Sequence, residues 1–430
     1  MRVSKSIQES LLAGIIRGVQ QSLSARLAVQ DLADKISSFF VPTVIVIAIF
    51  TFIIWYVIGN PNIALTNAIS VLIIACPCAL GLATPLSIFV ATGIGAQNGI
   101  LIRNARTVQK LEKVDVVAID KTGTLTKGQP RITAISHIPE ISEDELLLFA
   151  ASIEQGSEHP LAKAVLKKAS ERKLNLLPAI NFVYEIGLGL SATVNSKNVL
   201  IGKEDFLKNH GVDTSNLNEI VHNNLFIVTP IFIAIDGLAK GIFWIEDEIR
   251  EKAKETIETL KKLNVQLVML TGDKLGTARK IAQRLYIDRY FAELLPQDKA
   301  KIVCDLKAKG HLVAAAGDGI NDALALGEAD VGIAMGEGSG AALETADIII
   351  MHNDLSAIVK SIKLSRAMMG NIRQNLALAF LYNVLAIPIA AGVLSPKFGI
   401  SLSPAIASIA MILSSLSVIA NSLRLKTLKL

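Results

Sequence analysis

Four long apolar stretches, in two pairs separated by a long polar section, predict membrane-spanning helices. Residues 39–58 supply about twenty mostly apolar positions, enough to cross the hydrocarbon core of a bilayer. A second stretch covers 63–94, with interruptions at Pro77 and Pro85, because proline removes a helical hydrogen bond. Two more stretches cover 372–394 and 402–423. We therefore place pairs of transmembrane helices at 39–95 and 371–425.

The segment before the first span is amphipathic and predicts a helical stalk over residues 1–38. Apolar residues recur there at helical spacing, and no short apolar core of a cleavable signal peptide is present. Cationic residues flank one side of the spans: Lys35, Arg103, Arg106, Arg373, Arg424 and Lys426. The positive-inside rule then predicts a multi-pass integral membrane protein with both termini and the long polar section in the cytosol. The compact layout suggests a prokaryotic plasma membrane.

The polar section between the two pairs of spans alternates strand-like and helix-like runs, which predicts a mainly parallel α/β sheet. The strand-like runs are 116–119, 265–270, 312–316, 331–334 and 348–350, and the helix-like runs include 250–263 and 275–285. An insert over 129–242 has its own predicted helix (161–173) and strands (192–201 and 230–235). We expect one domain from 96–128 and 243–370, and an α+β domain inserted into it.

Composition narrows the class of protein further. Hydrophobic residues make up 51% of the chain and charged residues 19%, below the usual share of about 25%, which argues against a purely soluble protein. The net charge is +5 without a block of Lys or Arg, so nucleic acid is not an expected partner. Three cysteines are too few for a disulfide framework.

The candidate chemistry begins at Asp120-Lys121-Thr122-Gly123-Thr124-Leu125-Thr126, which follows the apolar run 114–119. A buried strand that ends in aspartate places a carboxylate at the edge where open α/β folds bind ligands. Such a carboxylate can attack a phosphate and become an aspartyl-phosphate. A lone Asp-x-Thr would be read as an ordinary strand followed by a turn, but seven residues of this pattern disfavour that reading.

Other polar residues at predicted strand ends complete a phosphoryl-transfer set. Mg²⁺ prefers hard oxygen ligands, which Asp120 and Asp318 can supply, with Asp322 close behind. Lys299 is placed to pair with the transferred phosphoryl group. The remaining candidates are Thr271, Gly272, Asp273 and Asn321.

These motifs resemble those of P-type ATPases of the heavy-metal branch, over nearly the whole chain. The resemblance implies that Asp120 is the phosphorylated nucleophile on a haloacid dehalogenase-like core, with Lys121 beside it. It implies that Thr122 helps to hold Mg²⁺ through its backbone. Asp247 and Arg250 match an Asp-x-x-Arg pattern where the insert rejoins the core.

The insert resembles the nucleotide-binding domain of the same family. Ser157-Glu158-His159-Pro160 matches a signature whose imidazole packs against adenine, and Glu154 matches an upstream acidic position. Gly187-Leu188-Gly189 lets the backbone approach a nucleotide closely. ATP is thus the implied substrate. Lys203 and Leu324 depart from the family, which usually has Asn and Pro there.

The motif Cys76-Pro77-Cys78 lies inside the second apolar stretch and predicts an ion site, because thiolates select soft ions. Single cysteines in helices more often only pack, but this motif resembles the ion-binding span of heavy-metal pumps. Later spans add Asn-x6-Tyr-Asn-x4-Pro and Met-x2-Ser-Ser, which resemble the copper(I)-exporting subgroup. The implied ligands are Cys76, Cys78, Tyr382, Asn383, Met411 and Ser415.

The leading interpretation is ATP-driven Cu⁺ transport through an aspartyl-phosphate. A Zn²⁺ or Cd²⁺ pump, a membrane-anchored phosphatase on the same core and a non-catalytic remnant are the alternatives. No Thr-Gly-Glu of the family's actuator domain is present. We therefore expect a truncated or split pump that turns over poorly alone. Its expected partners are membrane lipid, a separate chain that supplies the actuator domain, and a copper chaperone.

Overall fold

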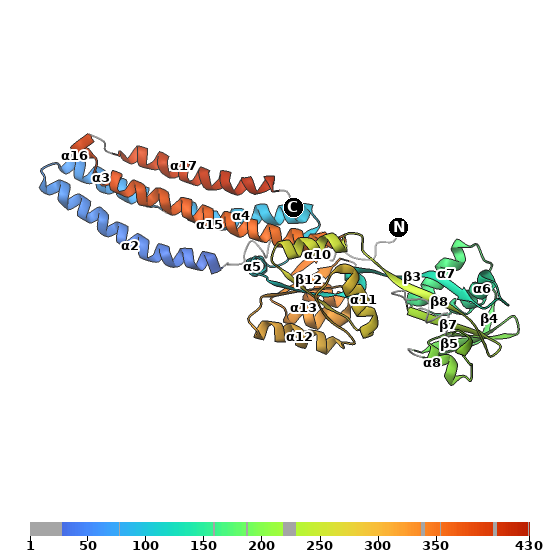
Figure 1. Cartoon of the computed structure of the whole chain (residues 1–430). Helices are drawn as coiled ribbons and strands as arrows, with labels where there is room; N and C mark the ends of the chain where they lie inside the picture. The colour runs from blue at the N-terminus through green and yellow to red at the C-terminus, as the bar shows by residue number, and fades with distance from the viewer. Residues whose placement is uncertain are drawn as a thin grey trace. The chain divides into compact units, whose positions relative to one another are not determined.

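The computed structural model places most of the chain (Figure 1). The described residues are 28–76, 78–157, 160–185, 188–217, 229–336, 340–352, 354–398, 402–428 and 430. Contacts group the chain into two compact units. The first unit contains the described residues within Met1–Ala118, Thr259–Gln266 and Ala300–Leu430. The second unit contains those within Ile119–Glu258 and Leu267–Lys299.

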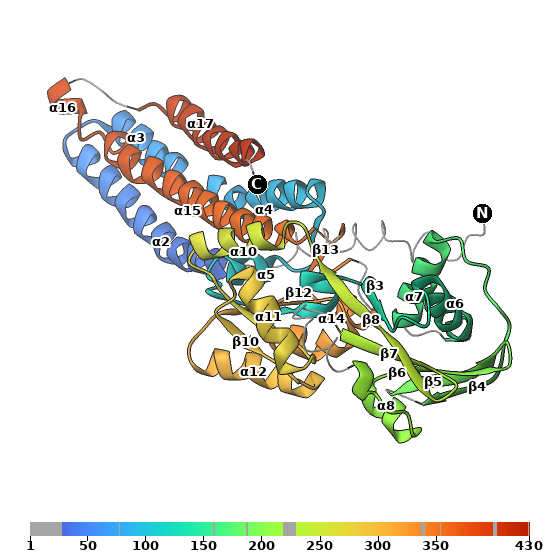
Figure 2. The same ribbon diagram turned by 45° about the vertical axis from the view of Figure 1, so that its right-hand side comes forward.

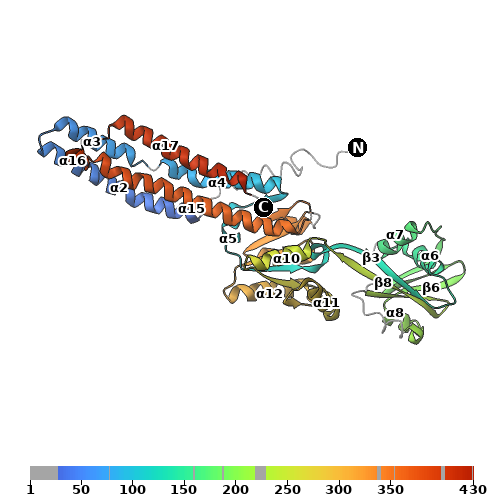
Figure 3. The ribbon, with the colours of Figure 1, turned by 45° about the horizontal axis from the view of Figure 1, so that its top comes forward.

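The apolar stretches form long helices in the first unit. These are α2 (Ala28–Val57), α3 (Pro61–Ile74), α4 (Cys78–Gln97), α15 (Ser356–Ala390) and α17 (Pro404–Leu423), with the short α16 (Ser395–Phe398) and η5 (Arg424–Thr427). Among the described residues, four helical stretches are long and apolar enough to cross a membrane: Lys35–Val57, Pro61–Gln97, Ser356–Ala390 and Pro404–Thr427. Figures 1 and 3 show these helices running side by side.

Buried alanine, valine and isoleucine side chains hold this helix bundle together. Ala79, Ala83 and Ala379 are buried with Val418 in one cluster that joins α4, α15 and α17. A second cluster joins α2, α3, α15 and α17 through Val44, Ala48, Val71, Ile74, Ala75, Ile387, Ala390 and Ala407. Between helices in lipid, small residues let the backbones approach closely, and van der Waals packing then drives association.

The polar section builds a seven-stranded sheet in the order β1-β13-β12-β11-β2-β9-β10. Its strands are β1 (Ile100–Ile102), β2 (Val116–Asp120), β9 (Gln266–Leu270), β10 (Arg289–Phe291), β11 (Val313–Gly317), β12 (Val331–Met335) and β13 (Ile348–Ile350). The pairs β9–β10, β11–β12 and β12–β13 are parallel, and β1 pairs with β13 antiparallel. β2, β11 and β12 are buried along their whole length, as expected for strands covered on both faces.

Helices connect the strands of this sheet, as the alternating pattern predicts. They are α5 (Ala105–Leu111), α10 (Ala253–Lys262), α11 (Leu275–Leu285), α12 (Pro296–Ala308), α13 (Ala323–Glu328) and α14 (Gly340–Thr345), with the single turn η4 (Ile320–Asp322). The predicted helix 275–285 coincides with α11.

The insert forms a six-stranded sheet in the order β3-β8-β7-β6-β5-β4 with antiparallel pairs (Figure 2). The strands are β3 (Thr126–His137), β4 (Ala179–Glu185), β5 (Gly189–Val194), β6 (Lys197–Gly202), β7 (Thr229–Ile235) and β8 (Leu238–Ile249). The helices are α6 (Glu143–Glu154), α7 (Pro160–Glu171) and α8 (Glu204–Asn209), with η3 (Ser215–Leu217).

The two faces of this sheet bury different cores, because successive side chains of a strand point to opposite sides. Along β7, Ile231 and Ile233 join the core shared with α6 and α7. Phe232 and Ala234 join the core on the other face, with Phe206 of α8. Figure 3 shows α6 and α7 on one face and α8 on the other.

Three sequence predictions need correction. The single strand predicted at 192–201 is a hairpin of β5 and β6, whose turn residues Asn195 and Ser196 both have positive φ. Pro85 lies inside α4 and does not interrupt it. The third apolar helix begins at Ser356, well before the predicted residue 372. The helix break near Cys76 is found, but Pro77 itself and the stalk up to residue 27 lie outside the described residues. The predicted domain boundaries stay predictions.

Candidate functional site

The Asp120 loop begins where the buried strand β2 ends, as the sequence predicts. Asp120 is only 7% exposed. The chain then makes a tight turn, η2 (Lys121–Leu125), in which Gly123 has φ +76°, a conformation that suits glycine. The Thr126 hydroxyl closes the turn by accepting from the Gly123 amide at 3.3 Å and bonding to the Lys121 carbonyl at 3.0 Å. The carboxylate is therefore held on a rigid support.

Two lysines form ion pairs at this loop. Lys299, in the first turn of α12, places Nζ 2.5 Å from Oδ1 of Asp120, and both side chains are buried. Lys121 pairs with Asp273. The buried Thr271 hydroxyl accepts a hydrogen bond from the Asp273 amide at 3.1 Å. The structure thus gathers predicted residues that lie up to 179 positions apart in the sequence.

Asp247 and Arg250 also hold the loop, although the predicted catalytic set omits them. The Arg250 guanidinium donates to the carbonyls of Gly123 at 2.7 Å and Thr124 at 2.9 Å. Asp247 lies 2.5 Å from the Thr126 hydroxyl and accepts from the Gln129 amide at 3.1 Å. The Asp-x-x-Arg pattern was the available sequence signal. These contacts tie the end of β8 to the loop that carries Asp120.

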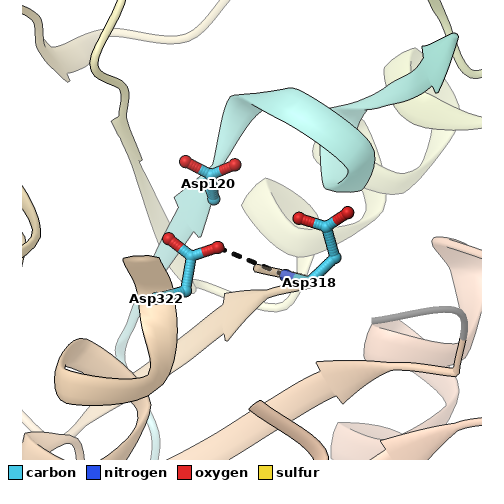
Figure 4. A group of neighbouring side chains, drawn as sticks. All are labelled: Asp120, Asp318 and Asp322. Atoms are coloured by element: carbon cyan, nitrogen blue, oxygen red, sulfur yellow. Dashed lines mark hydrogen bonds between the residues drawn. The ribbon is translucent and has the colours of Figure 1, made fainter. Parts of the chain in front are cut away.

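Three carboxylates lie together at this site (Figure 4). Asp120, Asp318 and Asp322 each offer one oxygen, and these oxygens lie within 4.8 Å of one another. Asp322 is buried, and its Oδ2 accepts from the amides of Asp318 (3.3 Å) and Gly319 (3.1 Å). Close carboxylates repel each other, and a divalent cation with hard oxygen preference relieves that repulsion. The donor set fits Mg²⁺.

The remaining predicted catalytic residues are more exposed to solvent. Thr122 is exposed on the loop, and Asn321 is exposed on η4. A Cβ at Gly272 would meet the Leu294 carbonyl at 3.2 Å, so this glycine packs closely against the neighbouring backbone.

Gly317, the last residue of β11, leaves the space that Asp322 occupies. A Cβ at this position would lie 2.5 Å from Cβ and 2.7 Å from Oδ2 of Asp322. We expect Gly317→Ala to displace Asp322 and to weaken Mg²⁺ binding by about 10-fold or more, since misplaced ligands lose affinity on that scale. Titration of Mg²⁺ against intrinsic fluorescence measures this. Gly276→Ala, where a Cβ meets nothing within 4 Å, is the control. Unchanged Mg²⁺ affinity in Gly317→Ala would contradict the expectation.

A cavity of about 190 Å³ opens between the insert's sheet and its helices α6 and α7. Its lining is mostly apolar with a few polar groups: Glu154, Ser157, Leu161, Val165, Tyr184, Leu188, Gly189, Leu190, Ile201, Gly202, Lys203, Ile231 and Ile245. Of the four residues predicted to bind nucleotide, Glu154 and Gly189 line the cavity. His159 and Gly187 lie outside the described residues.

Gly189 and Gly202 face each other across β5 and β6, and both line the cavity. A Cβ at Gly189 would meet Phe206 at 2.4 Å, and one at Gly202 would meet the Leu188 carbonyl at 2.6 Å. Neither position has room for a side chain. The sequence predicts that Gly189 allows close approach by a nucleotide, whereas the contacts show that both glycines are required by packing within the insert.

Glu154 is a buried acid at the end of α6. It is 5% exposed, and its Oε2 has no hydrogen-bond partner among the described residues. Burial raises the pKa of its carboxyl from 4.5 to about 7, and a hydrogen bond with Ser157 opposes that rise. A carboxyl that is half protonated near neutrality can both donate and accept hydrogen bonds.

The raised pKa of Glu154 makes the insert less stable as pH rises. The folded state binds the proton more tightly than the unfolded state, so this contribution is present below pH 4.5 and is lost between pH 4.5 and 7. The loss amounts to about 3 kcal/mol at most. We expect Glu154→Gln, which cannot ionise, to be more stable than the unsubstituted protein at pH 8 and close to it at pH 4.5. Denaturant unfolding at both pH values measures this, and parallel pH profiles would contradict it.

Sulfur atoms gather where α3 gives way to α4. Cys76 and Cys78 are joined by a disulfide, and Sγ of Cys78 lies 3.7 Å from Sδ of Met411 on α17. The structure thus brings together three of the six predicted ion ligands. Ser415 lies one turn after Met411 and bonds to its carbonyl at 3.2 Å.

The α15 residues of the predicted ion site differ in exposure. Asn383 is 6% exposed, whereas Tyr382 is 45% exposed and faces outward from the described helices. Asn375, from the same motif, belongs to a buried polar network instead. Its amide donates to Ser422 at 2.8 Å and accepts from Asn421 at 2.7 Å, which links α15 to α17.

Comparison with known proteins defines the class of the catalytic core first. A family model for haloacid dehalogenase-like hydrolases matches residues 114–330, and a second model of the same description matches 300–362. The core is therefore a haloacid dehalogenase-like domain, in agreement with the sheet and the carboxylate at the end of β2.

Relatives and solved structures define the family. The chain is 46% identical over 98% of its length to a copper-exporting P-type ATPase of Legionella pneumophila, covering 58% of that protein. It is 44% identical over its whole length to a silver exporting P-type ATPase of Salmonella typhimurium, covering 53% of it. It thus spans little more than half of these curated relatives.

A crystal structure of a zinc-transporting PIB-type ATPase in the E2.Pi state matches 99% of this chain and 68% of that one. The TM-score is 0.79 and the identity 33%. The catalytic domain of the CPx-ATPase CopB-B matches 63% of this chain and 98% of that one, with TM-score 0.53 and identity 31%. The chain belongs to the P-type ATPases, in their PIB branch.

Proposed function

We propose that this chain carries the catalytic and ion-binding parts of an ATP-driven Cu⁺ transporter. The observation that carries the proposal is the buried Asp120 carboxylate, paired with Lys299 at 2.5 Å and clustered with Asp318 and Asp322. A carboxylate with a cation and a metal-binding acid cluster beside it is the arrangement that phosphoryl transfer from ATP requires. Its named copper- and silver-exporting relatives support the same reading.

In the proposed reaction, an oxygen of Asp120 attacks the γ-phosphorus of ATP. The bond from that phosphorus to the β,γ-bridging oxygen breaks, and ADP leaves with the electron pair. Lys299 and the Thr271 hydroxyl stabilise the negative oxygens of the transferred group. Bound Mg²⁺ supplies further neutralisation of the phosphate oxygens, and Asp120, Asp318, Asp322 and the Thr122 backbone would hold it.

The other residues of the core position these groups. Lys121 is held by Asp273. Gly272, which follows Thr271, packs closely against the neighbouring backbone. Arg250 holds the carbonyls of the Asp120 loop in place. Asn321 lies beside Asp322 on η4. The insert supplies ATP through the cavity at Glu154 and Gly189, and we assign His159 and Gly187 to the same nucleotide site on the family resemblance.

The proposed cargo is Cu⁺, because its ligands would be soft sulfur atoms. As a reduced pair, Cys76 and Cys78 supply two thiolates, and Met411 supplies a thioether close by. Tyr382, Asn383 and Ser415 complete the proposed set. Zn²⁺ or Cd²⁺ is the second candidate, since a solved relative transports zinc. The proposed setting is a prokaryotic plasma membrane with both termini in the cytosol.

Lipid around the apolar helices, ATP, a copper chaperone and a chain that supplies an actuator domain are the proposed partners. The last two rest on the family resemblance alone. ATP as the substrate is expected from the named relatives, which are ATPases.

Phosphorylation of the full chain in detergent tests the proposal. With dithiothreitol, Mg²⁺ and γ-labelled ATP, we expect hydroxylamine-labile label on the protein, and more of it with Cu⁺ than with Zn²⁺. Equal or greater stimulation by Zn²⁺ would favour the second cargo. Absence of label would contradict the aspartyl-phosphate, and faster hydrolysis of p-nitrophenyl phosphate than of ATP would favour a phosphatase.

A further inference from the structure

We propose that Lys203 binds a phosphate group of the nucleotide in the cavity of the insert, and that it makes affinity rise with the number of phosphates. The inference rests on the proposed nucleotide site and adds a specificity-determining residue to it. Lys203 departs from the Gly-Asn-Arg pattern that many members of the resembled family carry.

The backbone fixes Lys203 at the cavity rim. It follows β6 directly, and its amide donates to the Leu188 carbonyl at 2.9 Å. Leu188 and Gly202 on either side of this bond both line the cavity, together with Lys203 itself. Gly202, the residue before Lys203, pairs with Gly189 across β5 and β6, and both glycines line the cavity.

Lys203 differs in charge from the other residues that line the cavity. The cavity wall is mostly apolar, Lys203 is its only cation, and Glu154 is its only acid among the described lining residues. A polyphosphate chain carries several negative charges, and no other described group of the cavity offsets them. The apolar wall suits the base and sugar of a nucleotide, which leaves the phosphates to the charged rim.

Lys203 is also unpaired within the described part of the chain, unlike its neighbours. Lys208 on α8 pairs with Glu204 at 2.7 Å, and Lys197 lies 3.8 Å from Glu145. No described carboxylate lies within 4.0 Å of the Lys203 ammonium. Binding a phosphate therefore requires no internal ion pair to break, and the attraction between the ammonium cation and the phosphate anion favours binding.

Isothermal titration of the full chain in detergent tests the inference. ATP, ADP, AMP and adenosine are titrated separately in EDTA, which removes Mg²⁺ and prevents phosphoryl transfer. For Lys203→Met we expect affinity to fall about 10-fold for ATP, about 5-fold for ADP and less than 2-fold for AMP, with adenosine unchanged, because the charge is attracted to the phosphates alone. Lys203→Arg keeps the charge and should keep the ranking.

Lys208→Met is the matched control, because it removes the same charge from the same part of the insert outside the cavity. It should leave all four affinities unchanged. Equal loss for all four ligands in Lys203→Met would show a structural role and overturn the inference, as would unchanged ATP affinity. If the unsubstituted chain binds no nucleotide, the proposed nucleotide site fails and the inference fails with it; if that chain binds normally and Lys203→Met does too, only the inference fails.

Discussion

Asp120→Asn is expected to reduce phosphorylation of the chain to background. The amide has nearly the same shape as the carboxylate, but it is a poor nucleophile and loses the negative charge that pairs with Lys299. Removing a covalent nucleophile costs several orders of magnitude in rate. The measurement is incorporation of label from γ-labelled ATP, with hydroxylamine sensitivity to identify an acyl-phosphate.

ATP binding should survive the same substitution, since the cavity at Glu154 is lined entirely by residues of the insert. We expect the affinity for ATP in Asp120→Asn to stay within about 2-fold of the unsubstituted chain, because no residue of the cavity changes. Asp115→Asn is the control, because Asp115 precedes the same strand and bonds to His311 and the Leu312 amide. Hydroxylamine-labile label in Asp120→Asn would refute the assignment of the nucleophile.

Much of the proposed phosphoryl-transfer site could be predicted because its signals are local in the sequence. A buried strand, an acid and a Gly-containing turn predict where Asp120 lies without knowledge of the fold. Parallel strands bring their carboxyl ends to one edge, so the residues after β9 and β11 were expected near it. Lys299 could be included because it follows Pro296 in a recognisable spacing.

Other parts of the site could not be predicted, because they depend on tertiary contacts that leave little trace in the sequence. The Asp-x-x-Arg pattern singles out Arg250, but its contacts with the carbonyls of Gly123 and Thr124 could not be foreseen, because backbone acceptors have no residue signature. The raised pKa of Glu154 comes from burial by several distant elements. The β5–β6 hairpin was missed because its turn uses Asn195 and Ser196 with positive φ, without the glycine that usually marks such turns.

In the apolar helices, too, some features could be predicted from the sequence and others could not. Their existence follows from hydropathy, but which polar residues meet depends on helix rotation. Asn375 and Asn421 could be read as part of an ion path, yet they bond to each other in a buried network with Ser87, Asn371 and Ser422. Hydrogen bonds of this kind hold helices together in lipid. Sulfur atoms, in contrast, gather at Cys76, Cys78 and Met411, although the two cysteines form a disulfide where the sequence predicts thiolates.

Cys78→Ser is expected to remove the response of phosphorylation to Cu⁺ while ATP binding remains. The substitution replaces a soft sulfur by a hard hydroxyl next to Met411, and we expect Cu⁺ affinity to fall about 100-fold or more, because soft ligands select this ion. The measurement is hydroxylamine-labile label against Cu⁺ concentration under dithiothreitol, so that both cysteines are reduced.

Three further variants decide how this loss is interpreted. Cys76→Ser should match Cys78→Ser, and Met411→Leu should give a smaller loss, because a thioether is a weaker ligand than a thiolate. Cys304→Ser is the control, since Cys304 is the free, exposed cysteine on α12. An unchanged Cu⁺ response in Cys76→Ser and Cys78→Ser would contradict the proposal that these cysteines bind the ion, even if Asp120 is still phosphorylated. Loss of label in Cys304→Ser as well would show general damage to the protein instead of loss of an ion ligand.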